Sequence, residues 1–250
     1  MFLLRLSYKI LQKLANVAGF NLIATKRSKK SGFHEMVLPK ATHAPWLSDR
    51  AFNEIYDTVK DYTLVDKYRC YELWQLVAEC AKLRGALIEV GVWRGGSGCL
   101  MAKKARTLGI KDTVYLCDTF KGIVKAGDKD SRYKGGEHAD TSKEIAEQII
   151  DKLKLENVKV LVGVFPEETA GTISDKVFRF CHIDVDVYQS AKDIMDWLWP
   201  KLAIGGMVVF DDYGFWACEG VTRFVDQERN KKDTIIIHNL NGHAIIIKRS

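Results

Sequence analysis

From Gly85 onward, short apolar runs alternate with segments of helical periodicity, and this alternation constrains the fold more than any other feature. The runs are apolar and partly β-branched, which is typical of strands buried on both faces. They lie at residues 85–90, 114–118, 158–162, 177–184 and 206–212. Strands that alternate with helices predict a mostly parallel sheet covered by helices on both sides. We therefore expect an α/β fold.

The segments between and before these runs predict helices at 51–59, 68–81, 95–102, 141–153, 167–174, 190–198 and 219–229. Two further runs, 234–238 and 243–248, flank a turn that contains Gly242, which predicts an antiparallel hairpin at the edge of the sheet. We expect residues 51–250 to form one domain, preceded by an arm of residues 1–50.

Acidic residues follow two of the predicted strands at the point where each strand ends. Asp184 and Asp186 follow one apolar run, and Asp211 and Asp212 follow another. In an open α/β sheet, ligands bind beyond the carboxyl ends of the strands. Four carboxylates that meet there repel one another unless a cation or a raised pKa relieves them, and oxygen ligands suit Mg²⁺. A magnesium site is the first interpretation. Helix capping by Asp184 and Asp211 is the alternative.

A glycine-containing loop, Glu89-x-Gly91-x-x-x-Gly95, follows the first strand. A dinucleotide site needs the closer spacing G-x-G-x-x-G to seat its pyrophosphate. An acid followed by wider-spaced glycines suits S-adenosylmethionine (SAM), with Glu89 at the ammonium directly or through water. Ser97 is then placed for the carboxylate and Asp118 for the ribose hydroxyls. A simple strand-to-helix turn is the alternative.

The polar, glycine-rich stretch 119–140 predicts a long loop near the same edge. His138 or Glu137 on this loop is a second candidate base, and a solvated surface histidine is the alternative interpretation. The segment 63–69 is a candidate cover for a ligand, through Tyr68 and Arg69. Two aromatic side chains are candidates for stacking against an acceptor, namely Tyr188 and Trp216.

Five motifs together resemble the macrocin O-methyltransferase family over roughly residues 60–230. They begin at Glu89, Cys117, Gly163, His182 and Gly205, and read EVGVWRGGS, CDTFKG, GVFPEET, HIDVDVYQS and GG…FDDYG. The resemblance implies a seven-stranded, Rossmann-like class I fold and SAM- and metal-dependent methylation of hydroxyls, mostly of sugars. It implies cofactor contacts from Glu89, Gly91, Ser97 and Asp118, with adenine near Gly163, Val164 and Phe165. It also implies Mg²⁺ ligation by Asp184, Asp211 and Asp212, with Asp186 as the base.

The expected function is therefore SAM-dependent O-methylation of a sugar or glycosylated metabolite, with Mg²⁺ chelated by the acceptor hydroxyls. Vicinal hydroxyls bound to Mg²⁺ are oriented and acidified, and Asp186 or His138 then accepts the proton. Two alternatives stay open. One is a catechol-type small-molecule O-methyltransferase, and the other is a membrane-docked methyltransferase that modifies a polysaccharide.

Residues 1–25 predict an amphipathic helix with Arg5, Lys9 and Lys13 along one stripe. We expect it to dock on the body or on a second subunit, and an anionic membrane surface is the alternative. The net charge of +6 over 250 residues is mild, which argues against a nucleic-acid partner. The six cysteines form no metal-binding or disulfide spacing, which indicates free thiols in the cytoplasm.

Overall fold

The computed structural model describes residues 10–15, 17, 37 and 41–250, in two units that divide between Lys40 and Ala41. In the first unit, residues 10–15 are helical, and the rest of the predicted N-terminal helix lies outside the described residues. The domain boundary expected at residue 50 stays a prediction. Within the described ranges, no helix combines the length and apolar character needed to cross a membrane.

The unit Ala41–Ser250 is built on one seven-stranded sheet in the order β3-β2-β1-β4-β5-β7-β6. Its strands are β1 (Ala86–Val90), β2 (Val114–Asp118), β3 (Val158–Val162), β4 (Phe178–Ile183), β5 (Leu202–Phe210), β6 (Thr234–His238) and β7 (Ala244–Lys248). The pairs among β1 to β5 are parallel, whereas β7 pairs antiparallel with both β5 and β6. The predicted parallel sheet and terminal hairpin are confirmed.

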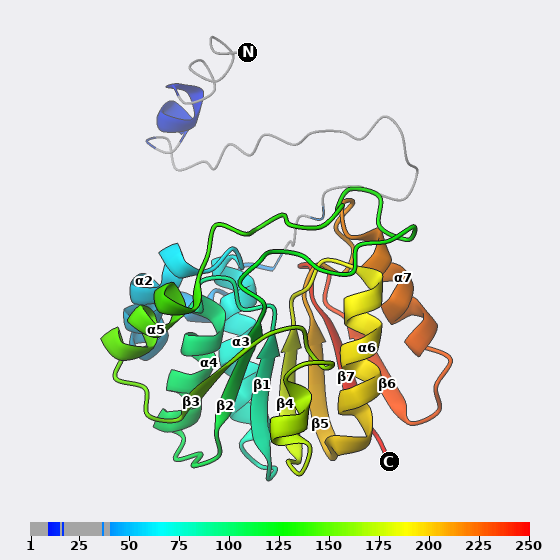
Figure 1. Cartoon of the computed structure of the whole chain (residues 1–250). Coiled ribbons are helices and arrows are strands. Elements are labelled where there is room, and N and C mark those ends of the chain that lie inside the picture. The colour runs from blue at the N-terminus through cyan, green and yellow to red at the C-terminus, as the bar shows by residue number, and fades with distance from the viewer. Residues whose placement is uncertain (1–9, 16, 18–36, 38–40) are drawn as a thin grey trace. The chain divides into compact units, whose positions relative to one another are not determined.

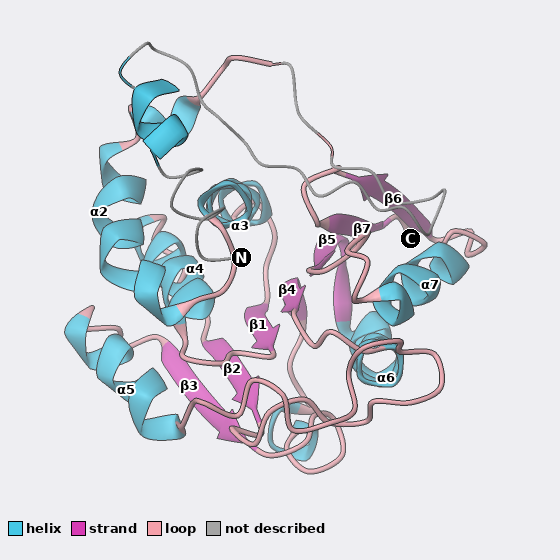
Figure 2. Ribbon diagram, turned by 90° about the horizontal axis from the view of Figure 1, so that it is seen from above, coloured by secondary structure: helices cyan, strands magenta, loops and turns pink. Residues whose placement is uncertain are grey.

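The helices are α2 (Arg50–Val59), α3 (Lys67–Cys80), α4 (Gly96–Thr107), α5 (Lys143–Lys152), α6 (Tyr188–Leu198) and α7 (Glu219–Glu228). Short 3-10 helices are η1 (Pro45–Leu47), η2 (Lys60–Tyr62), η3 (Ala170–Ile173) and η4 (Trp199–Lys201). Figure 2 shows α2, α3 and α4 on one face of the sheet and α6 and α7 on the other. Two apolar cores result, one on each face.

Side-chain caps explain where several helices begin. Asp49 accepts a hydrogen bond from the backbone N–H of Phe52, and Asp66 accepts from Tyr68 and Arg69. Ser142 accepts from the backbone N–H of Ile145. Each cap satisfies N–H groups that have no partner within the helix.

The short helix predicted over 167–174 is present only in part, as the 3-10 helix η3 at Ala170–Ile173. The segment begins at the cis peptide between Phe165 and Pro166. The backbone N–H of Glu168 donates to the carbonyl of Val164, and that of Ala170 donates to Pro166. Two isolated turns therefore replace a continuous α-helix.

All six cysteines are free and buried, at positions 70, 80, 99, 117, 181 and 218. Burial raises the pKa of every one of these thiols, that of Cys80 to about 12. Since the thiolate is the reactive form, we expect native protein at pH 8 to react with a disulfide reagent at fewer than about one thiol per chain, and denatured protein to react fully. Rapid labelling of several native thiols, counted by mass spectrometry, would contradict this packing.

Candidate active site

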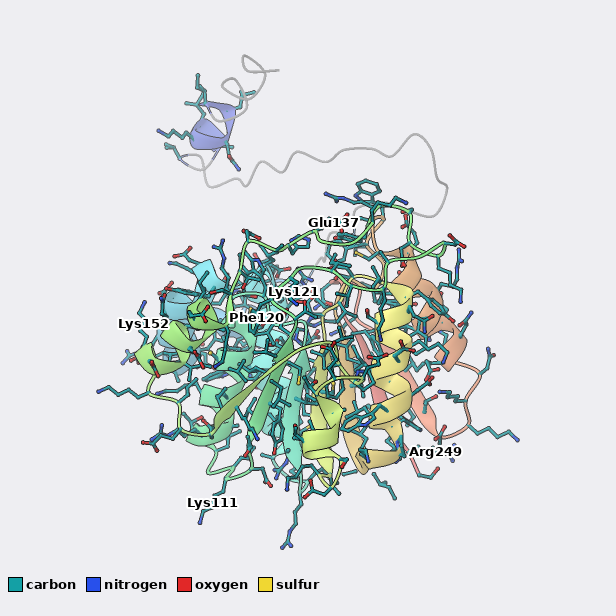
Figure 3. The ribbon with its side chains drawn as sticks, in the orientation of Figure 1. Lys111, Phe120, Lys121, Glu137, Lys152 and Arg249 are labelled. Atoms are coloured by element: carbon teal, nitrogen blue, oxygen red, sulfur yellow. The ribbon has the colours of Figure 1, made fainter. Side chains whose placement is uncertain are left out.

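A cavity of about 270 Å³ lies at the carboxyl ends of the parallel strands. Its wall includes the residue at or just after the end of each of the five parallel strands, namely Gly91, Asp118, Gly163, Asp184 and Asp211. The loop 119–140 extends along this edge. Figure 3 labels Phe120, Lys121 and Glu137 on it, far from Lys111 at the other end of the sheet. Figure 1 shows the same loop in green across the strand ends. The sheet therefore gathers residues from distant segments into one site.

The glycine loop is held close to the end of β4. Gly91 has a φ of 86°, and a Cβ on it would lie 1.7 Å from the carbonyl oxygen of Asp184. A side chain there is excluded by both backbone conformation and space. Gly95, with a φ of 91°, is the N-cap of α4. The loop can therefore approach a ligand with bare backbone.

Asp118 shapes this same loop. One carboxylate oxygen accepts hydrogen bonds from the backbone N–H groups of Val92 and Trp93 at 2.7 and 2.8 Å. The other accepts from the N–H of Phe120 at 2.7 Å. Asp118 also lines the cavity beside Ser97, Gly163 and Phe165. Four of the predicted cofactor residues therefore share one wall with Gly91.

Three other residues predicted at the cofactor do not line the cavity. The carboxylate of Glu89 is fully buried, and its Oε1 lies 2.8 Å from Nδ1 of His182. The side chain points into the core, and the expected contact of Glu89 with an ammonium group, direct or through water, stays a prediction. Gly95 is the N-cap of α4 and lies outside the cavity lining. Val164 also lies outside the lining, and its backbone N–H donates to Glu168 at 2.7 Å.

The predicted metal ligands Asp184, Asp211 and Asp212 converge, since each offers a carboxylate oxygen within 4.8 Å of the others. Burial, and then repulsion from Asp211, raises the pKa of both Asp184 and Asp212 well above the usual range. The ionised forms of Asp184 and Asp212 are therefore unfavourable in the absence of a cation. A bound cation would stabilise both carboxylates in their ionised forms. The donor set of oxygens fits Mg²⁺.

Asp211 differs from the other two because Arg69 and His243 lie against its carboxylate. Its oxygens accept from the guanidinium of Arg69 at 2.6 and 2.5 Å, and Nε2 of His243 lies 2.9 Å from Oδ1. Burial opposes the charged form, but His243 and Arg69 outweigh it and hold the pKa of Asp211 well below its usual range. Asp211 is therefore an anion at neutral pH.

Two of the three candidate bases, Asp186 and His138, line the cavity, whereas the Glu137 carboxylate is outside its lining and accepts from the N–H groups of Lys134 and Gly135. Asp186 and His138 are non-glycine residues with positive φ, 61° and 62° respectively, and Asp212 has a φ of 63°. Such strained backbone gathers at functional sites. The structure adds Tyr133, a cavity residue missed from sequence. Burial, and then the Asp186 charge, raises the pKa of its phenol.

The other candidates divide between the cavity and the core. The segment 63–69 contributes Thr63, Leu64 and Arg69 to the wall, whereas Tyr68 is exposed. Two residues predicted to stack on an acceptor do not line the cavity. Tyr188 is buried, with its hydroxyl hydrogen-bonded to Gln227, and Trp216 is 62% exposed.

The sequence model of the macrocin-O-methyltransferase (TylF) family matches residues 39–245. The chain belongs to this family. A demethyldecarbamoylnovobiocin O-methyltransferase of Streptomyces niveus is 32% identical over 159 residues, which cover 60% of each chain. A mycinamicin III 3''-O-methyltransferase of Micromonospora griseorubida is 28% identical over 71% of this chain and 75% of that protein. The matched part thus spans about three fifths of the first relative's length.

Solved structures agree with the fold of this macrocin O-methyltransferase family member. The O-methyltransferase NovP superimposes with a TM-score of 0.64 at 28% identity, covering 76% of this chain and 82% of NovP. The calicheamicin methyltransferase CalS11 gives a TM-score of 0.62 over 89% of this chain and 99% of that chain, at 13% identity, and supports the fold alone. The predicted class I methyltransferase fold is therefore confirmed.

Proposed function

We propose that this protein transfers a methyl group from SAM to a hydroxyl of a sugar or glycosylated metabolite, with the help of Mg²⁺. The observation that carries the proposal is one cavity in which the glycine loop and Asp118 face Asp184, Asp211 and Asp212. A methyl donor and an acceptor hydroxyl must meet in line, and this cavity joins a cofactor wall to a carboxylate wall.

The cofactor wall would hold SAM through backbone and side-chain contacts. Gly91 permits close backbone approach, and Ser97 lies in the first turn of α4, where free N–H groups favour a carboxylate. Asp118 lines the cavity, and one lone pair of its Oδ1 remains to accept a hydrogen bond from a ribose hydroxyl. Gly163 and Phe165 stay the candidates for the adenine, with neighbouring Val164 outside the cavity wall.

Asp184, Asp211 and Asp212, which line the same cavity, would hold the metal ion. Bound there, Mg²⁺ would supply a positive charge that orients and acidifies acceptor hydroxyls. Asp186 is the proposed proton acceptor, with His138 as the second candidate on the facing loop. Leu64, Ile123 and Phe165 contribute apolar surface that limits water in the cavity.

Relatives in this family carry names for different acceptors, including a rhamnosyl-tetracenomycin 4'-O-methyltransferase of Streptomyces olivaceus. A sugar hydroxyl is therefore the proposed acceptor class. The polysaccharide alternative depends on residues 1–25, which lie mostly outside the described residues. A cytoplasmic location and the absence of a nucleic-acid partner stay predictions.

The test combines calorimetric binding of SAM with product detection by mass spectrometry, using glycosides, nucleotide sugars and a catechol as acceptors. We expect SAM to bind, and turnover of a glycoside to stop in EDTA and return with Mg²⁺. Asp186→Asn should lower kcat by about 10²–10⁴-fold if Asp186 is the base, with His138→Gln as the matched variant. Failure to bind SAM, or full turnover in EDTA, would contradict the proposal. Methylation of the catechol alone would change the acceptor class.

A further inference from the structure

Two fully buried histidines lie side by side in the core beneath the carboxylate site. His182 is in β4, and His243 directly precedes β7. Their ring centroids are 5.8 Å apart with an interplanar angle of 73°. Neither ring lines the cavity, so the proposed methyl transfer gives them no direct task.

Each ring is oriented by a carboxylate on its Nδ1 side. Nδ1 of His182 lies 2.8 Å from Oε1 of Glu89, and Nδ1 of His243 lies 2.5 Å from Oε2 of Glu72. A carboxylate on one ring nitrogen fixes the tautomer and leaves the other nitrogen with a free lone pair. Metal-binding histidines are held in this way. Here the arrangement occurs twice within one cluster.

The Nε2 atom of each ring is buried. Within the described part of the chain, neither has a hydrogen-bond partner of acceptable geometry. His182, His243 and Asp211 each offer one ligand atom, and these three atoms lie within 4.8 Å of one another. Nε2 of His243 is 2.9 Å from Asp211 Oδ1, but off the direction of a hydrogen bond. Two buried nitrogens without a hydrogen-bond partner lower the stability of the fold, which favours a bound ion or molecule that contacts both.

The charges of the cluster favour a cation as that species. Glu72, Glu89 and Asp211 bring three carboxylates, against which Arg69 contributes one positive charge. A bound divalent ion would require both imidazoles in the neutral form, and the set would then carry two excess negative charges. One divalent ion balances them, and it also gives both Nε2 atoms a partner.

We propose that His182, His243 and Asp211 form a second metal site, for a divalent transition-metal ion such as Zn²⁺. Two imidazoles and one carboxylate are a common Zn²⁺ ligand set, whereas Mg²⁺ prefers oxygen ligands. The site is chemically distinct from the Asp184 and Asp212 carboxylates and shares Asp211 with them. It does not depend on methyl transfer, and its test reads metal binding directly.

The experiment titrates Co²⁺, followed by Zn²⁺ competition, into metal-stripped full-length protein in excess Mg²⁺. Co²⁺ bound to imidazole has visible absorption bands, and the Mg²⁺ occupies the oxygen ligands. We expect one Co²⁺ per chain, displaced by Zn²⁺. His182→Asn and His243→Asn should weaken binding on the order of 100-fold or more, since Asn retains an amide near the Nδ1 position but offers no Nε2 ligand. Glu72→Gln should weaken it by about 10–100-fold.

Two control variants separate this site from other metal ligands. His238→Asn removes an exposed histidine on the neighbouring strand β6, and Asp184→Asn removes a ligand of the magnesium set alone. Both should bind Co²⁺ as the original chain does. Circular dichroism and thermal melting establish that each variant is folded, and Glu72→Gln serves if a histidine variant fails to fold. No stoichiometric binding, or binding that Asp184→Asn abolishes and the histidine and Glu72 variants leave intact, would overturn the proposal.

Discussion

Asp184→Asn is expected to lower kcat/KM for methyl transfer by about 10³-fold or more, because a metal held by carboxylates supplies several kcal/mol of transition-state stabilisation. Asn keeps the size of the side chain and removes its charge. SAM affinity, measured by calorimetry, should change little, since the Asp184 carboxylate is not among the proposed SAM contacts, which come from Ser97 and Asp118. The Mg²⁺ concentration needed for half-maximal turnover should rise.

The same variant is expected to raise the melting temperature in EDTA. Burial and repulsion from Asp211 and Asp212 raise the pKa of Asp184, so at neutral pH the folded state disfavours its charge. A neutral side chain removes that penalty, which grows as pH rises above the usual pKa of an aspartate. Loss of activity with gain of stability would mark a functional carboxylate.

The matched control for this variant is Asp175→Asn, a carboxylate that is 70% exposed and distant from the cavity wall. It should leave both turnover and melting temperature almost unchanged. If Asp184→Asn retained full activity and the original Mg²⁺ requirement, Asp184 would not be a metal ligand.

Gly91→Ala is expected to cost more than about 4 kcal/mol of folding stability, or to prevent folding. Its Cβ would lie 1.7 Å from the carbonyl oxygen of Asp184, so β1 and β4 would have to separate at their carboxyl ends. The separation would also displace Asp184 from Asp211 and Asp212. Chemical denaturation measures the stability, and calorimetry measures the loss of SAM binding.

Gly109→Ala is the matched control for this substitution. Gly109 also has a positive φ, 73°, but nothing lies within 4 Å of the position of its Cβ. Gly109→Ala should therefore lower the free energy of unfolding by only about 1 kcal/mol, because only the backbone conformation is unfavourable for alanine. Similar losses for the two variants would show that the close approach of the glycine loop to Asp184 is unimportant.

Much of the fold followed from local patterns in the sequence. The predicted strands 114–118, 158–162 and 234–238 match the observed bounds, and the acids after β4 and β5 do converge. The exception at 167–174 also has a local cause, in the turns that follow Phe165-Pro166. Apolar periodicity and strand ends are properties of neighbouring residues, which explains why they could be predicted.

The sequence by itself therefore determined the α/β order, the glycine loop and the acids at the strand ends. Only the tertiary structure decided the partners of those acids. Glu89 faces His182 because β1 and β4 pair in that register, and Arg69 reaches Asp211 across 142 residues of chain. Tyr133 joins Asp186 in the same way, through a long loop. Such contacts depend on strand order, register and loop path, which no local pattern of residues encodes.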